Sequence, residues 1–117
     1  MLLVPLALVA CGPDYDRTEI AGVVTGKLGG SIDVSRVTVP EGSIVKAHLV
    51  SYDTDNKTMS AEIRSADERV LQIAPVVTKD DWAFLGIGPG RTTVDIKADG
   101  HTVLVIDAIV TPQPAPP

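Results

Sequence analysis

The chain has 117 residues, a formal net charge of −5 at pH 7, a single cysteine and 3% aromatic residues. A domain usually takes about 100–200 residues, so this length allows one core. The acidic balance argues against binding to nucleic acid, whose phosphates need a clustered cationic face. One cysteine excludes an internal disulfide framework and a thiolate-rich zinc site.

The first segment, residues 2–10, is an uncharged and mostly apolar run that ends directly before Cys11. A membrane-spanning helix needs about 20 apolar residues, so this run is too short to span a bilayer. Its length fits the apolar core of a secretory signal, about 7–15 residues, and Ala10 is the small residue that cleavage requires. The alternative is a buried strand in which the cysteine is an ordinary apolar residue. We predict a signal peptide over residues 1–10.

The sequence Leu8-Val9-Ala10-Cys11 resembles the lipobox of bacterial lipoproteins. The resemblance implies cleavage before Cys11, a diacylglycerol on its sulfur and an acyl chain such as palmitate on its new amine. Several acyl chains anchor a protein to a membrane effectively permanently, because each buried CH₂ contributes about 0.8 kcal/mol. Gly12 stands where the enterobacterial retention signal has Asp. The resemblance therefore implies the outer membrane rather than the inner membrane.

Two stretches flank the predicted domain. Residues 11–30 are rich in glycine, which predicts a flexible tether after the lipidated Cys11. The alternative for this stretch is a short edge strand around Ile20. Residues 111–117 are rich in proline, which predicts an exposed polyproline-type tail.

Between these stretches, residues 31–110 consist of short runs of alternating apolar and polar residues, separated by turn residues. We count about seven strands at spacings of about 8–12 residues, which predicts an all-β, antiparallel β-sandwich. Asp99-Gly100 predicts a two-residue hairpin, because both turn positions need a positive φ. Pro75 predicts an edge strand or a bulge. The apolar run His101–Val110 predicts burial on both faces or contact with a neighbouring molecule.

The segment from Val39 to Val110 resembles the bacterial Ig-like domains of surface proteins. Its matching motifs are short turns and strand starts: Glu41-Gly42, Ser65-Ala66-Asp67, Val70-Leu71 and the glycine-rich turn before Thr92-Thr93-Val94. The tryptophan that usually precedes the serine–acid step is absent, because Glu62-Ile63-Arg64 stands there. The resemblance implies an Ig-like β-sandwich of about seven strands.

A candidate metal site lies in the loop that contains Asp53, Asp55 and Asn56, because a hard cation such as calcium prefers oxygen ligands. The EF-hand pattern is incomplete, since Thr58 stands at the glycine position and Arg64 at the glutamate position. We favour the alternative, a polar turn whose side chains bond their own backbone. No metal site is therefore predicted.

No other motif indicates catalysis or a cofactor. His48 and His101 lack the spacing of a zinc site. Gly86–Gly90 is not followed by a helix pattern, so a turn is favoured over a phosphate site. Trp82 and Phe84 share one face of a strand, and we expect both in the core rather than on a carbohydrate-binding surface.

The sequence therefore predicts a lipid-anchored, non-enzymatic envelope or surface module for binding or adhesion. Its loops or an exposed strand edge are the expected binding surfaces. One alternative is a structural or accessory subunit of an envelope assembly, with a protein partner at the last strand. Another is a calcium- or carbohydrate-binding module that uses Asp53–Asn56 or Trp82. The sequence identifies neither the ligand nor the oligomeric state.

Overall fold

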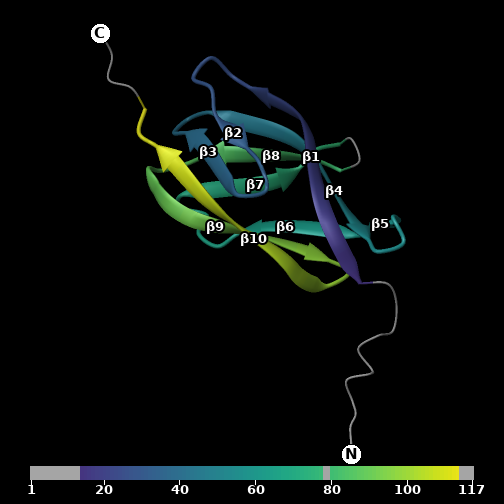
Figure 1. The fold of residues 1–117 in the computed structure, drawn as a ribbon. Helices are drawn as coiled ribbons and strands as arrows, with labels where there is room; N and C mark the ends of the chain where they lie inside the picture. Colours follow the sequence, from purple (N-terminus) through teal and green to yellow (C-terminus); the bar gives the residue numbers. More distant parts are fainter. Residues whose placement is uncertain (1–13, 78–79, 114–117) are drawn as a thin grey trace, which may run out of the picture.

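A computed structural model describes residues 14–77 and 80–113, which form two packed β-sheets without a helix (Figure 1). The predicted signal peptide and Cys11 lie outside the described residues. Within those ranges there is no helix that is long and apolar enough to cross a membrane. The predicted all-β sandwich is confirmed.

The described residues form ten strands rather than the expected seven. The first sheet has the order β1-β4-β8-β7, with β5 beside β4, and the second has the order β2-β3-β10-β9-β6. The bounds are β1 Tyr15–Thr25, β2 Ser31–Ile32, β3 Arg36–Pro40, β4 Ile44–Asp53, β5 Thr58–Met59, β6 Ala61–Ser65, β7 Leu71–Pro75, β8 Asp81–Gly86, β9 Gly90–Ala98 and β10 His101–Thr111. β2 and β5 have two residues each, too few for alternation to reveal them.

The second sheet is mixed, because β3 and β10 pair in parallel while the other strand pairs are antiparallel. In the parallel pair Val37 lies beside Ala108, and Val39 lies beside Val110. These residues are far apart in the chain, and the apolar pattern of a strand carries no information about the direction of a distant partner. The prediction of a purely antiparallel sandwich is therefore wrong for this pair.

The core lies between the two sheets and is built by alternation along each strand. Val45, Ala47 and Leu49 of β4 are at most 1% exposed, as their period of two predicts. Phe84 is fully buried and is the largest such side chain. The core residues are Ile32, Val37, Val39, Val45, Ala47, Leu49, Ile63, Leu71, Phe84, Val94, Ile96, Ile106, Ala108 and Val110.

β1 corrects the expected tether. Its residues pair with β4 from Tyr15 beside Asp53 to Thr25 beside Val45. Gly22 has a φ of 60° and lies where the register shifts. A glycine adopts this conformation without steric cost, so it allows a bulge rather than a flexible chain. The prediction of a flexible tether over residues 11–30 is thus wrong for residues 15–25, and the sandwich begins at Tyr15.

β10 presents two different faces. Ile106, Ala108 and Val110 are buried, whereas Val105 on the other face is 53% exposed. The expected burial on both faces is therefore wrong at Val105, and contact with a neighbouring molecule stays a prediction. Thr111 still belongs to β10, beside Pro40, so the predicted tail begins one residue too early.

Two turn predictions are confirmed. Asp99 and Gly100 have φ values of 50° and 89° and join β9 to β10 as a two-residue hairpin. Pro75 ends β7, which is an edge strand of the first sheet. Because proline has no N–H to donate, an edge is where the ladder tolerates it.

The chain enters and leaves the sandwich at opposite ends. β1 begins beside Asp53, the last residue of β4. β10 ends beside Pro40, which lies close to the first residues of β4. Figure 1 shows the start of β1 and the end of β10 at opposite corners of the molecule.

Candidate functional site: a cleft between β6 and β7

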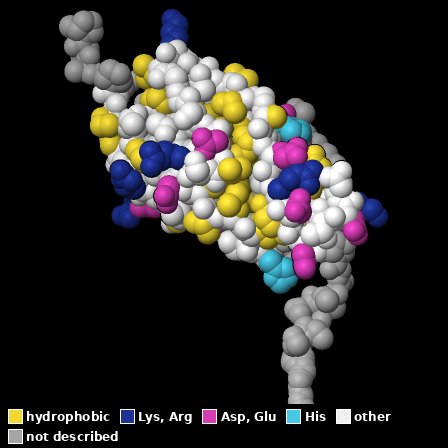
Figure 2. All heavy atoms as spheres, in the orientation of Figure 1, with side chains coloured by type: hydrophobic (Ala, Val, Ile, Leu, Met, Phe, Trp, Pro, Cys, Tyr) yellow, Lys and Arg dark blue, Asp and Glu magenta, His cyan; other side chains and the backbone are white. Residues whose placement is uncertain are grey.

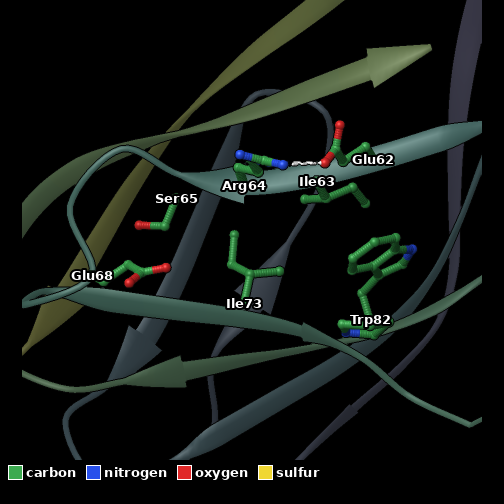
Figure 3. A pocket seen from close by; sticks show the side chains of 8 residues that line it. Glu62, Ile63, Arg64, Ser65, Glu68, Ile73 and Trp82 are labelled. Carbon is green, nitrogen blue, oxygen red and sulfur yellow. Dashed lines mark hydrogen bonds and ion pairs between the residues drawn. The ribbon is translucent and has the colours of Figure 1, made fainter. Parts of the chain in front are cut away.

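The described residues include a cleft of about 430 Å³ on the side of the sandwich where the edge strands β6 and β7 come together. β6 belongs to the second sheet and β7 to the first, so no ladder joins them. Figure 3 shows side chains from both strands pointing into this gap. The cleft is therefore an open seam between the two sheets.

Apolar side chains form the floor of the cleft. Ile63 of β6 is 3% exposed and belongs to the core, while Ile73 and Trp82 are half-buried and pack against the core. Trp82 pairs with Pro75 across β7 and β8. The prediction that Trp82 and Phe84 lie in the core is confirmed for Phe84, but Trp82 also lines the cleft.

Charged side chains form the rim. Arg64 donates a hydrogen bond from Nε to Oε2 of Glu62 over 2.9 Å, and both groups are well exposed. An exposed pair of this kind contributes at most about 1 kcal/mol to stability. Glu68 lies beside Ser65 at the end of the cleft away from Trp82 (Figure 3). No ion pair to Glu68 occurs among the described residues. The rim therefore carries one carboxylate more than its cations neutralise.

The loop that contains Asp53, Asp55 and Asn56 is the polar turn favoured by the sequence. Asp53 Oδ1 accepts hydrogen bonds from the backbone N–H groups of Asp55 and Lys57, each over 2.9 Å. Asn56 has a φ of 64°, and its Oδ1 accepts a hydrogen bond from Arg17 Nη2 over 2.6 Å. The oxygens of Asp53 and Asn56 thus hold the turn and the start of β1 in place. In residues 14–77 and 80–113, no three His, Cys, Asp or Glu side chains are grouped to hold a metal.

The two histidines are not brought together, because His48 lies in the first sheet and His101 in the second. His48 Nδ1 lies 2.9 Å from Oδ1 of Asp81 on the neighbouring strand. His101 is exposed at the start of β10. Both are strand residues that face solvent, as their sequence context indicates.

The glycine-rich segment Gly86–Gly90 carries the chain from β8 in one sheet to β9 in the other. A strand follows it, as predicted, so it lacks the helix N-terminus on which a phosphate site depends. Gly86 donates its N–H to the carbonyl of Ser43 over 3.0 Å and accepts from Gly42 over 2.9 Å. These hydrogen bonds join the end of β8 to the turn that precedes β4, at one end of the sandwich.

The surface face in Figure 2 carries cations and carboxylates intermixed around a stripe of hydrophobic side chains. One of the exposed apolar residues is Val105 of β10. Trp82 was recognisable in the sequence, but the cleft that it lines was not. The other lining residues come from β6, from β7 and, for Glu68, from the turn between them, and nothing local in the sequence shows that the edges of β6 and β7 lie side by side.

No known family model matches this chain, and no curated protein matches it. Solved structures with a similar fold belong to the surface-layer protein SbsC. One structure, of its domains 1–6, has a TM-score of 0.62 at 14% identity and covers 89% of this chain and 14% of that chain. A second structure, of domains 5–6, has a TM-score of 0.59 at 12% identity, and the match covers 86% of this chain and 45% of that chain. This chain spans about one seventh of the first structure's length, and such low identities show the fold alone.

Proposed function

We propose that this chain is a lipid-anchored, non-enzymatic module of the bacterial cell envelope that binds a partner through its β-sandwich. The lipobox resemblance at Cys11 supports the anchor. The likeness of the sandwich to domains of a surface-layer protein supports an envelope or surface location. The cleft between β6 and β7 offers a binding surface.

The observation that carries this proposal is the lipobox resemblance at Cys11, which lies only four residue steps before Tyr15, where β1 begins. Four residue steps span at most about 14 Å, even when fully extended. A lipid on Cys11 would therefore hold the sandwich directly at the bilayer surface. The anchor and the folded module would then act as one unit, without the long tether that the sequence suggested.

The chemistry of the cleft supports binding rather than catalysis. Glu62 is engaged by Arg64, and the only hydroxyl among the lining residues belongs to Ser65, which bonds the backbone of Asp67. A nucleophile needs an adjacent base to activate it, and no lining residue supplies a histidine or lysine. The cleft thus lacks an activated nucleophile for covalent catalysis, and its carboxylates are those of Glu62, held by Arg64, and Glu68.

Intact mass spectrometry of the chain from a bacterial membrane fraction tests the anchor. We expect loss of residues 1–10 and an added mass equal to a diacylglycerol plus one acyl chain. The matched control is Cys11→Ser, which we expect to carry no lipid and to leave the membrane fraction. An unmodified Cys11 in the isolated chain would contradict the proposal.

A second candidate is a structural subunit of an envelope assembly, which the 53% exposure of the apolar Val105 favours. Light scattering at increasing concentration tests this role. Self-association that Val105→Lys abolishes would support a structural subunit. A strictly monomeric chain at every concentration would instead favour the binding module.

A further inference from the structure

Among the residues that the structure describes, the edge of β6 that faces the cleft has backbone groups without a hydrogen-bond partner. The N–H of Ala66 donates to the carbonyl of Thr93 over 3.0 Å. The N–H of Asp99 donates to the carbonyl of Ser60 over 2.9 Å. Hydrogen-bonded positions alternate along an antiparallel pair, so Glu62 and Arg64 also direct their backbone groups toward β9. The N–H and C=O groups of Ala61, Ile63 and Ser65 therefore point away from β9. We call these groups the open edge of β6.

The facing edge of β7 is less suited to pairing. The N–H of Ile87 donates to the backbone carbonyl of Val70, and the N–H of Val76 donates to the backbone carbonyl of Asp81, each over 2.9 Å. By the same alternation, Ile73 and Pro75 direct their backbone groups into the cleft. Pro75 has no N–H, which is a common way to protect an edge. β6 has no proline, so its open edge is the unprotected side of the seam.

We propose that the cleft binds an extended peptide as an added strand on the open edge of β6, which gives the binding role proposed above a ligand class. The open edge presents donor and acceptor pairs at every second residue, a spacing that another extended backbone matches. Alternate side chains of such a peptide enter the cleft against Ile73 and Trp82. The excess carboxylate on the rim, at Glu68, favours a Lys or Arg in the peptide. The ligand is therefore an extended, apolar–polar alternating peptide with a basic residue.

β1 is also an edge strand, but its ladder with β4 contains two register shifts. Such irregularities twist a strand and hinder pairing with a further chain. The ladder between β6 and β9 has no register shift. The regular edge beside the cleft is therefore the better acceptor.

Hydrogen exchange on the full chain tests this proposal. The probe is a panel of acetylated and amidated nonapeptides in which Thr alternates with one apolar residue type and Lys stands at both ends. We expect a binding member of the panel to slow exchange of the Ile63 and Ser65 amides by about tenfold, because both gain a hydrogen bond. The amides of Glu62 and Arg64, which already bond to β9, should not change. A panel that leaves the Ile63 and Ser65 amides unchanged would overturn the proposal.

Ser65→Pro and Ser65→Ala form a matched pair of variants. Both lose the hydroxyl group, but only the proline variant loses the N–H of the open edge. We expect the proline variant to bind the peptide about two- to tenfold more weakly than the alanine variant, which corresponds to one hydrogen bond. Equal binding would overturn the proposal. If Ser65→Pro does not fold, the exchange measurement on the unaltered chain still decides.

Trp82→Leu separates a peptide from a sugar. An oligosaccharide that binds the unaltered chain, loses binding in Trp82→Leu and does not distinguish the two Ser65 variants would assign the cleft to glycans and overturn the proposal. None of these measurements depends on Cys11. Failure to find a lipid would contradict the anchor alone, and failure of peptide binding would contradict the added strand alone.

Discussion

Gly86 at the end of β8 lies directly against the backbone carbonyl of Pro40 at the end of β3. A β-carbon on Gly86 would overlap the carbonyl oxygen of Pro40 and approach its carbonyl carbon to 3.0 Å. The two strands belong to different sheets. This contact therefore sets how closely the sheets approach at one end of the sandwich.

Gly86→Ala should destabilise the fold because the backbone of Pro40 cannot move away without disturbing β3. Overpacking of this kind costs about 1–3 kcal/mol. Urea denaturation should show the loss as a lower midpoint. Gly26→Ala is the control, since no atom lies within 4 Å of a β-carbon there. Equal midpoints for the two variants would contradict the tight contact.

Gly100→Ala should destabilise the hairpin between β9 and β10 for a different reason. A β-carbon at Gly100 meets nothing within 4 Å, but its φ of 89° is unfavourable for other residues. The left-handed conformation costs a residue with a β-carbon about 1–2 kcal/mol. Gly100→Asn should cost less, because asparagine tolerates this conformation. If Gly100→Ala has a higher melting temperature than Gly100→Asn, the turn assignment is wrong.

Ser51→Ala should weaken the attachment of β1 to β4. Ser51 is 1% exposed, and its Oγ lies 2.8 Å from Oγ1 of Thr18. Loss of this buried hydrogen bond should cost about 0.5–1.5 kcal/mol in urea denaturation. Ser60→Ala at an exposed position serves as the control. A stability unchanged in both variants would argue against the buried contact.

Asp33 should titrate at an unusually low pH. Its Oδ1 accepts hydrogen bonds from the Ser35 hydroxyl over 2.6 Å and from the Ser35 and Arg36 N–H groups over 2.7 and 3.0 Å. The Ser35 hydroxyl is the largest cause that lowers the pKa of Asp33 below its ordinary value of 3.8. Carbon-detected NMR titration should place this pKa below 3.8, and Ser35→Ala should raise it.

The same shift gives Asp33 a defined effect on stability. Because the folded-state pKa is lowered, the carboxylate stabilises the fold above pH 3.8 and loses this effect as pH falls through the lowered value. The stability difference between the unaltered chain and Asp33→Asn should therefore shrink in that acidic range. A difference that grows on acidification would contradict the hydrogen bonds at Asp33.

Patterns within single strands could be predicted from the sequence. The alternation of Val45, Ala47 and Leu49 with polar neighbours placed the buried face of β4 correctly. Asp99-Gly100 defined its hairpin because its backbone requirement is local. Such signals need no knowledge of which strands become neighbours.

The start of the domain could not be predicted in the same way. Glycine is equally compatible with a flexible linker and with a strand that bulges, so Gly22 and Gly26 gave an ambiguous signal. Thr18 and Ile20 face the sandwich only because β1 pairs with β4. That pairing joins residues about 30 positions apart in the sequence, and neither segment encodes it alone.

The cleft shows the same limit more strongly. Trp82 was recognisable as an unusual residue, but the open edge of β6 follows from its hydrogen-bond register with β9. Pro75 indicated an edge strand without indicating which edge lies opposite. The site arises where two sheets end together, and sheet order is a property of the whole fold.

The entry of the chain at one end of the sandwich and its exit at the other determine how the module bears tension. A pull on Asp14 and Gln113 acts along β1 and β10, so it shears β1 against β4 and β10 against β3 and β9. In this geometry many backbone hydrogen bonds resist the load together rather than opening one after another. Survival of the fold under such a load depends on its rate of unfolding.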